Sequence, residues 1–191
     1  MKLDRPLPAD AARRRHLACC LLLALFALGL AGRAAHAQSQ TAEAKRAGEV
    51  AQVVFGIASY VRWPAPHAEI QLCLAGDTRY ADALLDGQTQ GQRIRTQRLG
   101  ALSAAALAEC QVVYIGGIGE AEREKLNAHL IGHPILAISE PIVPCSVANM
   151  FCLKFRDAQV GFDVNLDAIA RSGLRVHPNA LRIARRTAPQ P

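Results

Sequence analysis

The sequence contains none of the short motifs that usually mark a hydrolase, a nucleotide-binding protein or a zinc site. It has no G-x-S-x-G or S-x-x-K element, which argues against the common serine nucleophiles, and no C-x-x-C pair, which argues against a zinc site. The glycine-rich stretch 116–119 lacks the third glycine of a dinucleotide fingerprint and the Lys-Ser/Thr of a P-loop. We interpret it as a tight turn between a strand and a helix. We therefore expect no enzymatic activity, no cofactor and no metal.

A large excess of basic charge is also absent once the N-terminal segment is considered separately. Arg13 to Arg15 precede an apolar run over 17–30, and Ala35-His36-Ala37 has the small-x-small pattern of a cleavage site. These features predict a secretory signal peptide at residues 1–37 and a mature domain at residues 38–191. The signal segment holds six of the 22 Lys and Arg residues and two of the 16 Asp and Glu residues, which leaves a net charge of +2. This weak charge argues against a nucleic-acid partner.

Four cysteines follow the predicted cleavage site: Cys73, Cys110, Cys145 and Cys152. Four cysteines in an exported chain predict two disulfides, and the sequence permits three pairings. We favour Cys145–Cys152 because the two residues are local in the sequence, which leaves Cys73–Cys110. That second pair lies at the edges of neighbouring predicted strands, so its geometry is plausible.

The remaining sequence alternates between strand-like and helix-like segments. Hydrophobic periodicity predicts helices at 41–61, 80–85, 102–108, 120–131 and 166–172. Short apolar or alternating runs predict strands at 69–75, 93–99, 110–115, 135–139, 149–155 and 160–165. This alternation predicts a mostly parallel sheet, and the short turn at 156–159 adds a C-terminal antiparallel hairpin. The expected fold is a single three-layer α/β domain with two disulfides.

Candidate ligand-binding residues are the cationic side chains that follow the last predicted helix. Arg171, Arg175 and His177 lie within seven residues and could bind a carboxylate or phosphate, or form a surface cluster at a helix end. Trp63, the only tryptophan, is either a core anchor after the first helix or the wall of a pocket. For the cationic cluster and for Trp63, both alternatives remain open.

Candidate protein-contact residues lie where the last strand passes into the last helix. Asp163, Asn165, Asp167 and Ile169 project from this segment. Ile169 fits the apolar side of the helix as a half-buried core residue. An exposed isoleucine among charged neighbours would instead be an anchor for a protein partner.

Five stretches of the sequence resemble the YfiR family of periplasmic proteins. In chain order they are GIASYVRWP (56–64), CLAGD (73–77), CQVVYIG (110–116), ILAISE (135–140) and VGFDVNLDAIARSGLRV (160–176). Each stretch is short, but their order and spacing together are specific. The resemblance covers nearly all of the mature region, roughly 47–185.

The resemblance implies a periplasmic repressor that binds the periplasmic sensor domain of an inner-membrane, YfiN-like diguanylate cyclase. Repression would lower cyclic di-GMP and biofilm formation, and an outer-membrane, YfiB-like lipoprotein would relieve it. The resemblance also implies a homodimer and sensitivity to redox state, with the Cys145–Cys152 type of bridge needed for a competent fold.

The family also implies roles for particular residues. The segment from Asp163 to Ile169 would contact the cyclase, with Asp163 standing where some relatives have Glu. Arg175 and His177 would line a small-ligand pocket, for which their cationic side chains favour a small anionic compound. The alternative function is a periplasmic small-molecule binding protein, in which Trp63, Arg175 and His177 form the principal site.

Overall fold

The computed structural model describes residues 40–85, 93–156 and 159–183. Residues 44–191 form one compact unit, which begins with a helix through residue 59, while residues 40–43 lie outside this unit and are also helical. The strands are β1 (Val61–Arg62), β2 (Glu69–Ala75), β3 (Arg93–Arg98), β4 (Val112–Ile115), β5 (Leu136–Ser139), β6 (Phe151–Arg156), β7 (Gln159–Val164) and β8 (Arg175–Val176). The later helices are α2 (Asp82–Leu85), α3 (Ala104–Ala108), α4 (Glu120–Leu130), α5 (Leu166–Ser172) and the 3-10 helix η1 (Pro178–Arg182).

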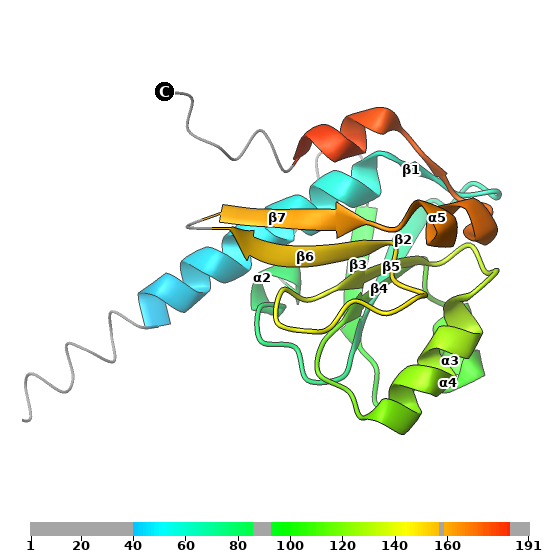
Figure 1. The fold of residues 1–191 in the computed structure, drawn as a ribbon, viewed down its shortest axis with the longest axis horizontal. Coiled ribbons are helices and arrows are strands. Elements are labelled where there is room, and N and C mark those ends of the chain that lie inside the picture. The colour runs from blue at the N-terminus through cyan, green and yellow to red at the C-terminus, as the bar shows by residue number, and fades with distance from the viewer. Residues whose placement is uncertain (1–39, 86–92, 157–158, 184–191) are drawn as a thin grey trace, which may run out of the picture. The chain divides into compact units, whose positions relative to one another are not determined.

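Six of these strands form one sheet in the order β3-β2-β4-β5-β6-β7 (Figure 1). The strands from β3 through β6 are parallel to their neighbours, and β7 returns antiparallel to β6, with Phe151 opposite Val164 and Arg156 opposite Gln159. The predicted mostly parallel sheet and its C-terminal hairpin are therefore confirmed. A separate ribbon pairs β1 with β8, which the sequence did not indicate.

Each face of the sheet centre carries its own hydrophobic core. The even-numbered side chains of β2, β4 and β5 pack with the first helix, and those of β6 and β7 that point the same way join this core. The odd-numbered side chains of the three central strands pack with α3 and α4 on the other face. Parallel strands covered on both faces are expected to be apolar along their length, as β4 is. Helices on both sides make this the predicted three-layer fold.

The first helix ends earlier than its sequence predicts. Its helical residues stop at 59, whereas the predicted helix continued to Val61. Val61 instead lies in β1, opposite Val176 of β8. The helix ends because its apolar periodicity gives way to strand pairing with a distant segment, and this part of the prediction was wrong.

The glycine-rich turn after β4 is needed for a close approach between two backbones. A Cβ atom on Gly116 would lie 2.2 Å from the carbonyl oxygen of Asp77. Gly117 and Asp77 form an antiparallel bridge, with N–H···O distances of 2.7 and 2.9 Å. The tight-turn interpretation of this stretch is confirmed.

A buried carboxylate at the end of β5 holds the loop that follows β2. Glu140 is fully buried and accepts hydrogen bonds from the backbone N–H groups of Arg79 (3.1 Å) and Tyr80 (2.6 Å). The Tyr114 hydroxyl lies 3.3 Å from the same carboxylate. Burial, and secondarily the Glu140 charge, raises the pKa of the Tyr114 hydroxyl well above its ordinary value. Glu140 thereby joins β4, β5 and the loop before α2.

Replacing Glu140 by glutamine tests this anchor. The amide keeps the shape but offers one acceptor oxygen where two N–H groups now bind, so one buried donor loses its partner. We expect Glu140→Gln to lower the free energy of unfolding by about 1–3 kcal/mol in urea denaturation. Glu124→Gln on the exposed side of α4 is the matched control and should change little. Equal stability of the two variants would contradict the anchor role.

Candidate functional site

The helix α5, which follows β7, is capped at both of its ends. The Asn165 side chain caps α5, because its Oδ1 accepts from the N–H of Ala168 at 3.0 Å, and Gly173 ends the helix in the left-handed region with φ 76°. The Nδ2 group of Asn165 donates to the carbonyl of Val147 at 3.3 Å. Asn165, predicted as a contact residue, therefore holds α5 and the loop before β6 together.

The other predicted contact residues have different surroundings. Asp163 is half-exposed and pairs with Lys154 and with Arg156 (3.2 Å), and the hydrogen bond from Lys154 lowers the pKa of its carboxyl. Asp167 is strongly exposed and lies 3.8 Å from Arg171 one helical turn later. Ile169 is half-buried and packs against the first core, as its position on the helix indicated. The two carboxylates are thus the accessible members of this set.

Two exposed apolar residues lie beside this segment and were missed from the sequence. Leu166, the first residue of α5, is 69% exposed, and Val147, in the loop before β6, is 64% exposed. The Asn165–Val147 hydrogen bond holds their two segments next to each other. We refer to Val147 and Leu166 as the exposed apolar pair. The sequence signal for Val147 was an apolar residue inside a short loop between two cysteines.

Both predicted disulfides are confirmed. Cys73–Cys110 has a Cα–Cα distance of 5.9 Å, and both residues are buried in the core beneath α3 and α4. Cys145–Cys152 has a Cα–Cα distance of 5.6 Å and joins the loop before β6 to β6 itself. Its Cys152 is buried, whereas Cys145 is exposed.

The loop that carries Val147 is also bound to α4. The Ser146 hydroxyl donates to Oδ1 of Asn127 at 2.8 Å and lies 3.0 Å from Oδ1 of Asn149. Together with the disulfide and the Asn165 bond, this contact connects the loop to three elements: β6, α4 and α5. The position of Val147 is therefore set by covalent and hydrogen-bonded restraints rather than by burial of its own side chain.

Two of the predicted ligand-binding residues lie on or next to the β1–β8 ribbon. Arg175 is the direct cross-strand partner of Arg62, so two cations face each other across an antiparallel pair. The His177 ring stacks on Tyr60 with centroids 6.0 Å apart, and its Nδ1 accepts from the N–H of Asn179 at 3.1 Å. The third predicted cation, Arg171, lies on α5 and pairs with Asp167 instead.

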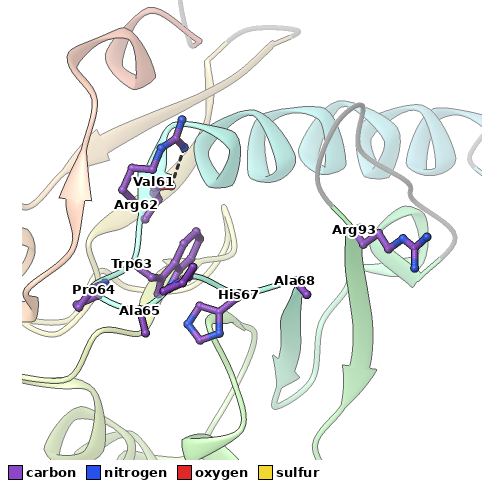
Figure 2. A pocket seen from close by; sticks show the side chains of 9 residues that line it. Val61, Arg62, Trp63, Pro64, Ala65, His67, Ala68 and Arg93 are labelled. Carbon is purple, nitrogen blue, oxygen red and sulfur yellow. Dashed lines mark hydrogen bonds between the residues drawn. The ribbon is translucent and has the colours of Figure 1, made fainter.

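Trp63 lines an open cavity of about 700 Å³ beside this ribbon (Figure 2). Its indole N–H donates to the carbonyl of Gln111 at 3.3 Å, and its ring meets that of His67 edge-on at 6.3 Å. Trp63 also packs partly against the first core, so it has both of the roles left open above. Arg62 and Arg93 complete the polar lining, and the described lining includes no carboxylate. Arg175, His177 and Arg171 are not among the lining residues of this cavity.

Two further observations apply to the described residues as a whole. No group of three or more His, Cys, Asp or Glu side chains among them is arranged to hold a metal ion. None of the helices in the described ranges is long and apolar enough to span a bilayer. The prominent features are a loop with many restraints, an exposed apolar pair and a cationic cavity.

A family model described as YfiR/HmsC-like matches residues 49–185. The chain belongs to the YfiR/HmsC-like family. Membership supports a periplasmic regulator of cyclic di-GMP signalling that acts within a diguanylate cyclase system. The family is regulatory and non-catalytic.

The unequal exposure of the two disulfides predicts selective reduction. In folded protein titrated with dithiothreitol, Cys145–Cys152 should open at lower reductant concentration than Cys73–Cys110. The reason is that a thiolate of the reductant can reach the exposed Cys145, whereas both Cys73 and Cys110 are buried. Alkylation and peptide mass analysis at each concentration report which cysteines are free. Repeating the series in urea provides the control, since both bridges should then react together. Earlier labelling of Cys73 and Cys110 in folded protein would contradict the prediction.

Proposed function

We propose that this protein is a periplasmic repressor that binds the periplasmic sensor domain of an inner-membrane diguanylate cyclase and so lowers cyclic di-GMP and biofilm formation. The observation that carries the proposal is the exposed apolar pair, held in place beside the accessible Asp167 in a chain of the YfiR/HmsC-like family. Exposed leucine and valine side chains at a fixed position suit a protein partner, because burying them gains hydrophobic free energy.

The restraints on the loop support a contact surface that is organised before binding. A loop that is already fixed loses less conformational entropy when a partner binds. The Cys145–Cys152 bridge closes a short loop and contributes about 2–3 kcal/mol in the chain-entropy model. Its position matters more than this stability, since it holds the loop of Val147 against β6.

This arrangement supports redox control of the repressor. Reduction would leave the loop with only its hydrogen bonds, through Ser146 to α4 and through Val147 to Asn165. The exposed apolar pair would then be less ordered and the cyclase would bind more weakly. An outer-membrane lipoprotein that covers the same surface would relieve repression by competition. The homodimer implied by the family belongs to the same proposal.

The direct test is binding of the purified protein to the periplasmic domain of its cognate cyclase, oxidised and reduced side by side. We expect binding in the oxidised state and weaker binding after reduction of Cys145–Cys152. Calorimetry measures both affinities, and a Cys145→Ser, Cys152→Ser variant serves as a reduced form that reductant cannot change further. Equal affinities would remove the redox control but keep the repressor. No binding in either state would contradict the proposed function.

A matched pair of substitutions tests the exposed apolar pair itself. Leu166→Ser removes an exposed side chain at the start of α5, where serine is tolerated, so folding should be unaffected. We expect its affinity for the cyclase domain to fall about tenfold, the effect of losing a contact worth roughly 1–2 kcal/mol. Ile131→Ser at the end of α4 removes another exposed apolar residue (44%) and should bind normally. Equal loss in both variants would show that general surface hydrophobicity, not this site, drives binding.

A second candidate function is binding of a small anionic ligand, favoured by the cationic cavity and the Arg62–Arg175 pair. Arg175 is exposed and faces another cation, so Arg175→Ala should leave thermal stability unchanged or slightly raised. It should weaken the response to carboxylate and phosphate compounds, followed through the fluorescence of Trp63, the only tryptophan. Arg171→Ala on α5 is the control. A large loss of stability in Arg175→Ala would show that Arg175 is structural.

A further inference from the structure

The outer edge of β7 carries a defined pattern of backbone groups. Within the described residues no strand pairs with this edge, and β7 is the last strand of the sheet (Figure 1). The Asn165 N–H bonds the Met150 carbonyl, and these two residues continue the β6–β7 register. Because hydrogen-bonded pairs alternate in an antiparallel ladder, the odd-numbered residues of β7 bond to β6. The N–H and C=O groups of Val160, Phe162 and Val164 therefore point outward.

The two faces of β7 differ in chemistry. Val160 and Phe162 are buried in the first core, whereas Gly161 and Asp163 lie on the opposite face, which α3 and α4 do not cover. Arg156 of β6 extends across Gly161, since a Cβ atom there would lie 3.2 Å from Cδ and 3.3 Å from Nε of Arg156. Its guanidinium reaches Asp163 at 3.2 Å. The absence of a side chain at Gly161 thus brings a cation toward the outer edge of the sheet.

A groove of about 370 Å³ follows this edge. Its lining combines residues of β7 with Arg156 of β6 and Leu181 of η1. Leu181 is 46% exposed, so an apolar surface also remains open here. An extended strand along this edge would direct alternate side chains to the face that carries Arg156 and to the opposite face. The suitable occupant is a strand that alternates apolar residues with small or acidic ones.

We propose that this edge is a homodimer interface, in which β7 pairs antiparallel with β7 of a second copy about a two-fold axis at Phe162. The strand itself has the required alternation, with Val160, Phe162 and Val164 on one face and Gly161 and Asp163 on the other. An isologous contact is the usual way in which one surface is buried against its own copy. The proposal gives an interface to the homodimer of the proposed function, and it does not depend on cyclase binding.

Hydrogen bonding favours the register centred on Phe162. It places Val160 opposite Val164 of the second copy and Phe162 opposite its own equivalent. All three outward-facing residues then form hydrogen-bonded pairs, and each pair exchanges two bonds. Apolar side chains lie opposite apolar side chains, a favourable cross-strand arrangement.

Charge selects the same register. Gly161 lies opposite Asp163 of the second copy, so the Arg156 guanidinium above Gly161 meets that carboxylate, and symmetry repeats the pair. A register centred on Gly161 would instead bring the two Arg156 groups together near the axis, where like charges repel. A single short strand pair buries little area, so the dimer should be of modest affinity and dependent on concentration.

Charge reversal in trans tests the interface. Arg156→Glu and Asp163→Lys each place like charges across the dimer axis and should weaken self-association about tenfold or more. An equimolar mixture should recover a heterodimer. In it the carboxylate introduced by Arg156→Glu in one chain faces the ammonium introduced by Asp163→Lys in the other, while the unchanged Arg156 and Asp163 keep their attraction. Sedimentation velocity over a concentration range compares the wild type, each variant and the mixture. Arg95→Glu, which breaks the exposed Glu69–Arg95 pair at the other edge of the sheet, is the matched control and should dimerise normally.

The outcomes separate the interface from a purely structural role. Recovery of association in the mixture supports the proposal, since an ion pair within one chain cannot be restored by a second chain. Monomeric variants whose mixture stays monomeric, or variants that dimerise like the wild type, would overturn it. If either charge variant fails to fold, Val164→Pro removes an outward N–H at the edge while leaving the β6 pairing intact, and an undiminished dimer would then overturn the proposal. A monomeric wild type would overturn both the homodimer and its interface but leave the cyclase-binding test unaffected.

Discussion

Within the described residues, helices cover both faces of the sheet at its centre but only one face at its C-terminal hairpin, and the proposed contact surfaces depend on this difference. The odd-numbered side chains of β2, β4 and β5 are buried beneath α3 and α4. At β6 and β7 the same face carries Lys154, Arg156 and Asp163, which pair with one another in contact with solvent. The first core continues beneath the hairpin on the opposite face. The hairpin is therefore held firmly from one side while it presents charge and an open edge on the other.

The chain from β5 to β6 connects this rigid centre to the exposed surface. At its beginning, the buried Glu140 accepts hydrogen bonds from two backbone N–H groups. At its end, Cys152 lies in β6 and is bonded to the exposed Cys145. Between these points Val147 is exposed, yet its backbone carbonyl is bound by Asn165. Exposure of an apolar side chain on a backbone that is held in place is a common property of contact surfaces.

The fold could be predicted from the sequence where local patterns determined it. The strand at 69–75 and the helix at 166–172 have the predicted bounds, because periodicity, the Asn165 cap and Gly173 all act over a few residues. The disulfides followed from sequence proximity and from neighbouring strands. The β1–β8 ribbon was missed because two-residue strands carry no periodicity and pair segments that are far apart in the chain.

The candidate site was predicted less completely, for a related reason. The sequence located the β7–α5 segment, but it could not distinguish Asn165 as a cap from Leu166 as an exposed residue. Exposure depends on what the rest of the fold covers, which is a tertiary property. Likewise, four residues were grouped as one ligand site, whereas the structure places Trp63 at a cavity, Arg175 and His177 at the ribbon, and Arg171 in an ion pair on α5.

Asp163 links the two proposed surfaces. In the proposed arrangement its carboxylate faces Arg156 of a second copy, and it also begins the segment proposed to contact the cyclase. A carboxylate that serves one partner is less available to the other, so the two equilibria are coupled. Coupling of this kind is reciprocal: the factor by which dimerisation weakens cyclase binding is the factor by which the cyclase weakens the dimer. Leu166 and Val147 lie beyond the end of β7 and are not part of the strand pair, so the apolar part of the cyclase contact is compatible with either oligomeric state.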